Sequence, residues 1–149
     1  MKIIPATPEH VLVIGPLFDQ YRVFYKQPSN LTASTQFIQE RLTHKESIIF
    51  LALSDEATPI GLGFTQLYPS FSSESLKRLW ILNDLYVSPA ARKQGVGEAL
   101  MERASQFAKD DHAKGLSLET AMNNFPAQRL YERIGWKRDE EFYRYNLIF

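Results

Sequence analysis

The segment that most constrains the fold is an apolar run followed by a glycine-containing loop, a helix and a second apolar run. Residues 78–87, RLWILNDLYV, are typical of a buried strand, and residues 116–120, LSLET, of a shorter one. Between them, from Gly95 onwards, apolar residues recur with helical spacing. Because a strand–helix–strand crossover joins parallel strands, this segment predicts a sheet with at least one parallel pair.

Local patterns predict the remaining elements. Thr7 and Pro8 open a helical pattern that Pro16 kinks or splits, and Gly135 closes the last helix as a left-handed cap. The other predicted strands are residues 2–5, 47–54, 59–68 and 141–149, a Ser-rich loop follows at 69–75, and the helices are residues 7–25, 32–44, about 95–108 and 123–134. Together they predict one α/β (α+β) domain over residues 1–149, with a mixed sheet of about six to seven strands and about four helices on both faces.

The composition restricts the chemistry open to the chain. It has no cysteine, and its three histidines lack metal-ligand spacing, so we expect no disulfide, no metal and no thiolate nucleophile. Lys and Arg total 17, as do Asp and Glu, which predicts no nucleic-acid partner. Because the sequence has neither a long apolar run nor a signal-peptide pattern, we expect no membrane partner and a cytoplasmic location.

The loop after residues 78–87 carries the strongest functional signal. Residues 92–97, RKQGVG, place a basic residue and Gly-x-Gly at a helix start, where backbone amides and the helix dipole favour an anion. A plain structural turn is the alternative. Leu100 stands where the dinucleotide-binding fingerprint needs its third glycine, and the Gly-Lys-Ser/Thr of the nucleoside triphosphatases is absent. The sequence therefore lacks the fingerprint of a nucleotide-binding domain.

Residues 87–104, VSPAARKQGVGEALMERA, resemble the acyl-CoA loop of the GNAT superfamily of N-acetyltransferases, whose signature is Arg/Gln-x-x-Gly-x-Gly/Ala. Residues 123–136, NNFPAQRLYERIGW, resemble the Asn-x-x-Ala-x-x-x-Tyr helix of the same superfamily. The resemblance covers residues 46–149, and the first 45 residues fit by their two-helix pattern. LNDLYV and RLYERIGW are most similar to the branch of polyamine, diamine and histone acetyltransferases.

The resemblance implies that acetyl-CoA is the acyl donor. Its pyrophosphate would lie on the backbone amides of the loop, and its pantetheine arm would pair with main-chain groups of the preceding strand. Asn124, Ala127 and Tyr131, on one face of the last helix, would line the pantetheine arm. The implied donor-binding residues are Leu85, Tyr86, Val87, Arg92, Lys93, Gln94, Gly95, Val96, Gly97, Glu98, Asn124, Ala127 and Tyr131.

The resemblance also implies direct attack of a primary amine on the thioester, with Tyr131 as the general acid. The base stays open. Diamine acetyltransferases of this branch have Glu where this sequence has Asn83, so the candidates are Asp84, Glu119 and a water held by Asn83. Because that Glu is missing, a catalytically silent acyl-CoA-binding regulatory module is the alternative function.

Other interpretations of these residues are structural. Asp84 could instead cap a loop or pair with Arg78 or Arg92. Aromatic residues at helical spacing near the end of the first helix form either core or part of an acceptor wall: Phe18, Tyr21, Phe24 and Tyr25. The acceptor itself, a small-molecule amine, polyamine, amino acid or protein lysine, is left open. The superfamily and the apolar residues 141–149 imply a homodimer.

Overall fold

A mixed five-stranded sheet forms the centre of the structure, a computed structural model that describes residues 1–149. Neighbours among the first four strands are antiparallel, whereas the fifth runs parallel to the fourth. The crossover therefore forms the parallel pair that the sequence predicts. In sheet order the strands are β1 (Lys2–Pro5), β2 (Ile48–Leu53), β3 (Gly61–Ser72), β4 (Lys77–Val87) and β5 (Gly115–Ser117).

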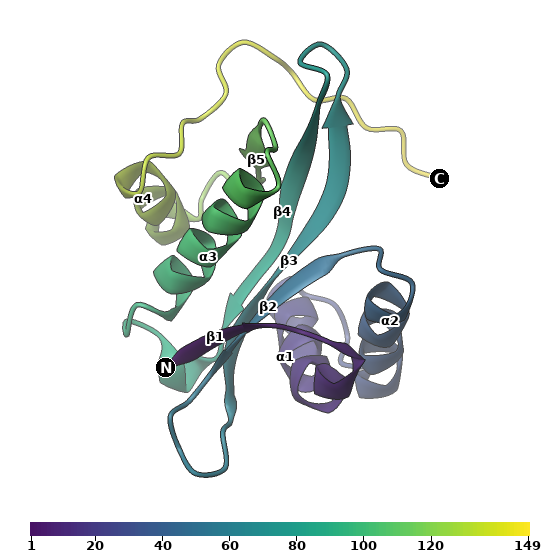
Figure 1. Ribbon diagram of the computed structural model, residues 1–149, viewed down its shortest axis with the longest axis vertical. Coiled ribbons are helices and arrows are strands. Elements are labelled where there is room, and N and C mark those ends of the chain that lie inside the picture. Colours follow the sequence, from purple (N-terminus) through teal and green to yellow (C-terminus); the bar gives the residue numbers. More distant parts are fainter. The chain divides into compact units, whose positions relative to one another are not determined.

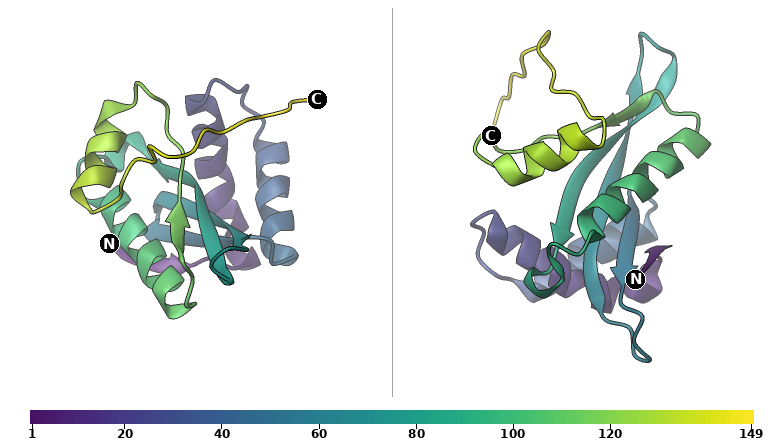
Figure 2. Two further views of the ribbon diagram at one scale, coloured as in Figure 1. Left: turned by 90° about the horizontal axis from the view of Figure 1, so that it is seen from above. Right: turned by 90° about the vertical axis from the view of Figure 1, so that its left-hand side faces the viewer.

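Four α-helices and two short 3-10 helices connect the strands or follow them. They are η1 (Pro8–His10), α1 (Val11–Phe24), α2 (Leu31–Thr43), η2 (Pro89–Ala91), α3 (Val96–Asp110) and α4 (Phe125–Arg133). α1 and α2 lie on one face of the sheet and α3 on the opposite face (Figure 1, Figure 2). The α/β class is confirmed. The chain forms two compact units, residues 1–118 and residues 119–149, and α4 belongs to the second.

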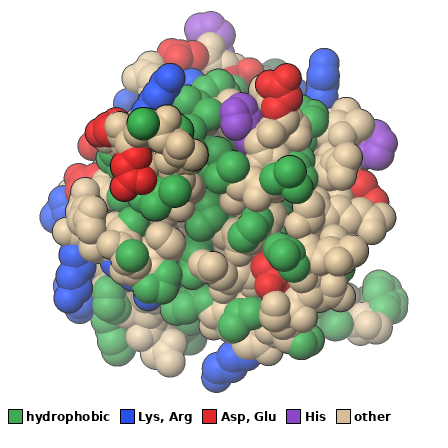
Figure 3. Space-filling model, turned by 90° about the horizontal axis from the view of Figure 1, so that it is seen from below, with side chains coloured by type: hydrophobic (Ala, Val, Ile, Leu, Met, Phe, Trp, Pro, Cys, Tyr) green, Lys and Arg blue, Asp and Glu red, His purple; other side chains and the backbone are tan.

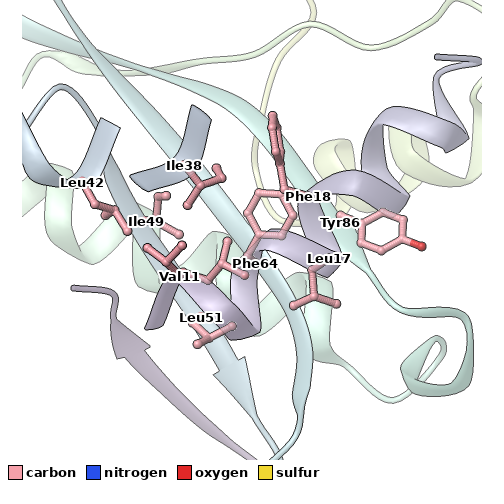
Figure 4. Packing of buried hydrophobic residues seen from close by; sticks show 10 residues of the cluster. Val11, Leu17, Phe18, Ile38, Leu42, Ile49, Leu51, Phe64 and Tyr86 are labelled. Atoms are coloured by element: carbon pink, nitrogen blue, oxygen red, sulfur yellow. The ribbon is translucent and has the colours of Figure 1, made fainter. Parts of the chain in front are cut away.

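A cluster of buried apolar residues fills the space between the sheet and the first two helices (Figure 4). Phe64 of β3 and Ile38 of α2 are fully buried in it, and Tyr86 of β4 belongs to the same cluster. Each large apolar side chain buried here stabilises the fold by roughly 1.5–3 kcal/mol. The helices α1 and α2 therefore cover the face of the sheet to which the Tyr86 ring belongs.

The first helical region is not split at Pro16. α1 continues through it, and the break falls earlier, between η1 and α1 at His10. A proline inside a helix costs about 3 kcal/mol because it removes one hydrogen bond and crowds the preceding turn. Ile14, Leu17 and Phe18 around it are all buried, and their burial outweighs that cost.

The hairpin of β3 and β4 is longer than predicted. Its ladder continues to the pair Ser72 and Lys77, so most of the predicted loop at 69–75 is strand. The Arg78 guanidinium lies over the Phe71 ring, 4.6 Å from its centroid. Cross-strand contacts of this kind stabilise a long two-stranded ladder whose sequence alone is typical of a loop.

The predicted strand at residues 141–149 is wrong, and the sheet has five strands rather than six or seven. Residues 134–149 contain neither helix nor strand, and β5 ends at Ser117. An alternating apolar pattern becomes a strand only where a neighbouring strand accepts its backbone hydrogen bonds. Six large side chains here are exposed: Phe142, Tyr143, Tyr145, Leu147, Ile148 and Phe149.

The surface shows no concentration of one charge on the face drawn in Figure 3. Acidic and basic side chains are interspersed there with hydrophobic ones. None of the helices combines the length and the apolar character needed to cross a bilayer. Nowhere do three or more His, Asp or Glu side chains gather as a metal ion would require.

Candidate active site

The glycine loop leads from β4 into α3. Lys93 and Gly95 both adopt left-handed backbone conformations, with φ of 61° and 79°. Gly95 is the N-cap residue, no side chain caps the helix, and the first helical bond runs from the Ala99 amide to the Gly95 carbonyl, at 3.0 Å. The amides of Val96 and Gly97 therefore have no acceptor within the helix, and the helix start is suited to an anion.

Arg92 is held at the base of this loop by contacts on three sides. Its Nε donates to the Val87 carbonyl at 3.1 Å. Its guanidinium lies 5.8 Å from the centroid of the Tyr86 ring and 6.0 Å from that of Phe24. Gln94 fixes the turn from the other side by donating to the Ala90 carbonyl at 3.1 Å. The positive charge at the loop is thus placed by the main chain and two aromatic rings.

Gly95→Ala is expected to lower the free energy of unfolding by about 1–2 kcal/mol, because a Cβ is strained in the left-handed region. Space is not the cause, since a Cβ at this position meets nothing within 4 Å. Gly115 in β5 is equally unobstructed but has no left-handed backbone, so Gly115→Ala is the matched control. Urea unfolding of the two variants measures the difference, and equal stabilities would contradict the assignment of strain.

One edge of β4 lacks a paired strand beside the loop. The ladder between β4 and β5 ends at the pair Ile81 and Ser117. The Ser88 amide donates to the Leu62 carbonyl of β3 at 2.9 Å, and antiparallel ladders alternate the direction of these groups. The main-chain groups of Tyr86 consequently face β3, whereas those of Leu85 and Val87 face the unpaired edge.

A β-bulge interrupts β4 next to this edge. Gln66 of β3 pairs with Asp84, and Leu67 pairs with Leu82, so Asn83 has no partner across the ladder. Asn83 is exposed, whereas the Asp84 residue retains only 2% of its accessible surface. The bulge places a carboxylate beneath the helices of one face, where bulges commonly re-aim side chains at functional sites.

The Asp84 carboxylate is surrounded by hydrogen-bond donors. Gln66 Nε2 donates to its Oδ2, and Asn83 Nδ2 donates to its Oδ1 at 2.8 Å. The Tyr21 hydroxyl donates to the Asn83 carbonyl at 3.4 Å and also hydrogen-bonds to Asp84. Burial raises the pKa of the Asp84 carboxyl, and these hydrogen bonds only partly oppose it. A carboxylate with a raised pKa is a stronger base than that of an ordinary aspartate.

Asp84 forms ion pairs with neither arginine that the sequence suggests. Arg78 instead lies 3.6 Å from Asp111, and Arg92 bonds to the main chain. Asp111 also accepts a hydrogen bond from the Trp80 indole at 2.8 Å. The interpretation of Asp84 as a surface ion-pair partner is therefore wrong.

The aromatic residues at the end of α1 divide between core and surface. Phe18 is buried in the core, whereas Phe24 and Tyr25 are about half exposed. Burial raises the pKa of the hydroxyls of Tyr21, Tyr25 and Tyr68, and the nearby Asp84 charge raises it further. These tyrosines stay neutral at physiological pH and form a half-buried wall beside the carboxylate.

The unit of residues 119–149 carries the other predicted residues. Asn124 is the N-cap of α4 and accepts a hydrogen bond from the Ala127 amide at 3.4 Å, so its side chain has a structural role. The Tyr131 ring lies 6.3 Å from that of Trp136, and the Trp136 amide donates to the Tyr131 carbonyl at 2.9 Å. Gly135 has φ of 100°, which confirms the predicted left-handed cap. The exposed Glu119, the other candidate base, forms an ion pair with Arg144.

Sequence reasoning did not single out Gln66 and Ser47. Ser47 Oγ donates to Gln66 Oε1 at 2.8 Å, and both residues are buried. The available signal is the polar Gln66 within the apolar run 59–68. A buried polar residue in a strand is uncommon unless it is hydrogen-bonded, so it marks a position with a specific partner.

Comparisons with known proteins point to a family of acetyltransferases. Residues 15–136 match the acetyltransferase (GNAT) family. An uncharacterised N-acetyltransferase of Bacillus subtilis strain 168, YhfO, is 44% identical over 147 residues, covering 99% of this chain and 97% of its own length. A probable acetyltransferase of Haemophilus influenzae is 31% identical over 143 residues, covering 89% of this chain and 97% of its own. The crystal structure of a probable acetyltransferase, 48% identical, superposes with a TM-score of 0.94 over 100% of this chain and 98% of its own. The chain therefore belongs to the GNAT family of acetyltransferases.

Proposed function

We propose that the protein transfers the acetyl group of acetyl-CoA to a primary amine, with Asp84 as the general base. The observation that carries the proposal is the buried Asp84 carboxylate at a bulge of β4, beside a strand edge that has no partner strand. Family membership supports the acetyl transfer. The narrower assignment to the branch of polyamine, diamine and histone acetyltransferases stays a prediction.

The loop and the strand edge suit the chemistry of CoA. The amides of Val96 and Gly97 at the start of α3 would hold the pyrophosphate, with Arg92 and Lys93 supplying positive charge. Main-chain groups of Leu85 and Val87 would hydrogen-bond to the amides of the pantetheine arm. Bound in this way, acetyl-CoA supplies the thioester that the amine attacks.

Asp84 removes the proton that keeps the amine unreactive. A primary alkyl amine has a pKa near ~10.4 and is mostly protonated at neutral pH. Because Asp84 is buried, the proton reaches it through the hydroxyl of Tyr21, which is half-buried and hydrogen-bonded to it. The Val87 amide, on the unpaired edge, stabilises the developing oxyanion, and such a donor contributes ~3 kcal/mol. Tyr131 protonates the departing thiolate.

The exposed apolar segment at residues 142–149 supports a homodimer. Its side chains alternate in the manner of a strand, and an unpaired segment of this kind pairs readily with another chain. Sedimentation equilibrium is expected to give a dimer for the full chain and a monomer for a chain ending at Asp139. A monomeric full chain would contradict this assignment.

The experiment that tests the function is CoA release from acetyl-CoA over a panel of polyamines, amino acids, aminoglycosides and lysine peptides. At least one amine is expected to raise thiol release well above background hydrolysis. Thermal unfolding with CoA, NAD or ATP is the companion measurement. Stabilisation by CoA without turnover of any amine would favour a silent acyl-CoA-binding module, and stabilisation by NAD or ATP alone would favour a nucleotide-binding domain.

A further inference from the structure

Three polar side chains form a hydrogen-bonded line across the buried face of the sheet. Ser47, next to the start of β2, donates to Gln66 Oε1 at 2.8 Å, and Gln66 Nε2 donates to Asp84 Oδ2. Their exposed fractions are 6%, 0% and 2%. Removing polar groups from water is costly, so a line of three at the core requires every member to be satisfied.

The two ends of the Gln66 amide match their neighbours only in one orientation. An ionised carboxylate accepts hydrogen bonds and donates none, so it needs the amide NH₂. Ser47 can donate, and it does so to the amide oxygen, which leaves the NH₂ for Asp84. The arrangement is therefore complementary to the ionised form of Asp84, which is the form able to accept a proton.

No positively charged side chain stabilises the negative charge of the Asp84 carboxylate, so this charge depends on hydrogen bonds. The titratable groups that face Asp84 are Tyr21 of α1, Tyr25 directly after α1 and Tyr68 of β3, all neutral at physiological pH. The charges of Arg41 and Glu46 shift the pKa of Tyr68, but neither charge contributes to the pKa of Asp84. Only hydrogen bonds from Asn83, Gln66 and Tyr21 oppose its burial.

We propose that Gln66 is a positioning residue that keeps the buried Asp84 carboxylate ionised and ready to accept the proton of the amine. The inference rests on the proposed role of Asp84 as the base. Gln66 touches neither the donor nor the acceptor in this scheme. It acts by donating a charge-assisted hydrogen bond that is stronger to the ionised form than to the protonated one.

Gln66→Met tests the proposal, because methionine has nearly the shape of glutamine and cannot donate the bond. The pKa of Asp84 is expected to rise by about one to two units, the equivalent of one lost hydrogen bond to a charged group. Carbon-detected NMR titration measures this pKa directly, with Asp84→Asn identifying the carboxyl resonance. The acid limb of the kcat/KM profile is expected to move to higher pH by the same amount, with the rate recovered above it.

Thr65→Val is the matched control. Thr65 is also fully buried in β3, but its hydroxyl donates to the main-chain carbonyl of Asp84, at 2.9 Å, rather than to the carboxylate. This variant is expected to lose stability while leaving the acid limb in place. Gln66→Glu, which puts a second carboxyl beside Asp84, is expected to raise the pKa of Asp84 at least as far as Gln66→Met.

The outcomes separate this inference from the proposed function. An unchanged Asp84 pKa in Gln66→Met would overturn the positioning role, whatever the enzyme does. A raised pKa in the NMR titration together with a fully active Asp84→Asn variant would uphold the positioning role and overturn Asp84 as the base. Equal shifts in Gln66→Met and Thr65→Val would show a general loosening of the strand and contradict the inference.

Discussion

Asp84→Asn is expected to lower kcat/KM for the amine by ~10²–10⁴-fold, the usual contribution of a positioned general base. Asparagine keeps the size of the side chain and its place in the bulge, but it cannot take up a proton. In the unmodified protein, activity is expected to rise with pH through the raised pKa of Asp84, because only the ionised form is a base. Initial rates across a pH series measure both effects.

The stability of the same variant is expected to move in the opposite direction. Because the pKa of Asp84 is raised in the folded state, the native protein binds its proton more tightly than the unfolded chain does. The free energy of unfolding therefore falls as the pH rises from the ordinary pKa of aspartate through the raised pKa of Asp84. The Asp84→Asn variant has no carboxyl at this position and does not show this fall. Asp111→Asn is the control, since it weakens the bonds to Trp80 and Arg78 at the surface and is expected to lower stability with little effect on rate. Full activity of Asp84→Asn would remove Asp84 from the mechanism.

Tyr131→Phe is expected to lower kcat by ~10²–10⁴-fold with little change in the KM for acetyl-CoA. Phenylalanine keeps the ring contact with Trp136 and removes the hydroxyl that we propose protonates the thiolate. The defect is expected to shrink above pH ~8.5, the ordinary pKa of a thiol, where the leaving group no longer needs a proton. Stopped-flow detection of the released thiol follows the rate in each buffer.

Tyr143→Phe is the matched control for the second variant. Tyr143 lies in the exposed C-terminal segment, so loss of its hydroxyl is expected to change neither rate nor stability. A Tyr131→Phe enzyme with wild-type kcat would assign protonation of the thiolate to water or to another group. A raised KM with unchanged kcat would instead assign Tyr131 to donor binding.

The sequence predicts those features that depend on local patterns. The crossover between residues 78 and 120, the glycine loop and the left-handed cap at Gly135 follow from spacing and backbone preference, and the structure contains all three. The strand at residues 141–149 fails because its pattern needs a partner strand that local sequence does not specify.

The surroundings of Asp84 could not be predicted from the sequence, for a related reason. Residue types alone leave Asp84 free to be a surface ion-pair partner or a base, and the decision depends on which side of the sheet it occupies. Gln66 bonds to it from β3, 18 positions away along the chain, and Ser47, 37 positions away, is linked to it only through Gln66. Contacts of this range are set by strand register, which a one-residue shift changes completely.

The face of the sheet that each side chain of β4 occupies depends on the number of residues in the strand as well as on their chemistry. Trp80 and Tyr86 are separated by an even number of positions, so a regular strand would show both to the same side. Trp80 instead meets Phe107 of α3, and Tyr86 joins the cluster beneath α1 and α2. The bulge at Asn83 inserts one extra residue, so every later side chain of β4 lies on the face opposite to the one that regular alternation would give it. Deleting Asn83 would make the ladder regular and leave Asp84 opposite Gln66 on the face of α1 and α2, so what the bulge adds beside the carboxylate is the exposed amide of Asn83.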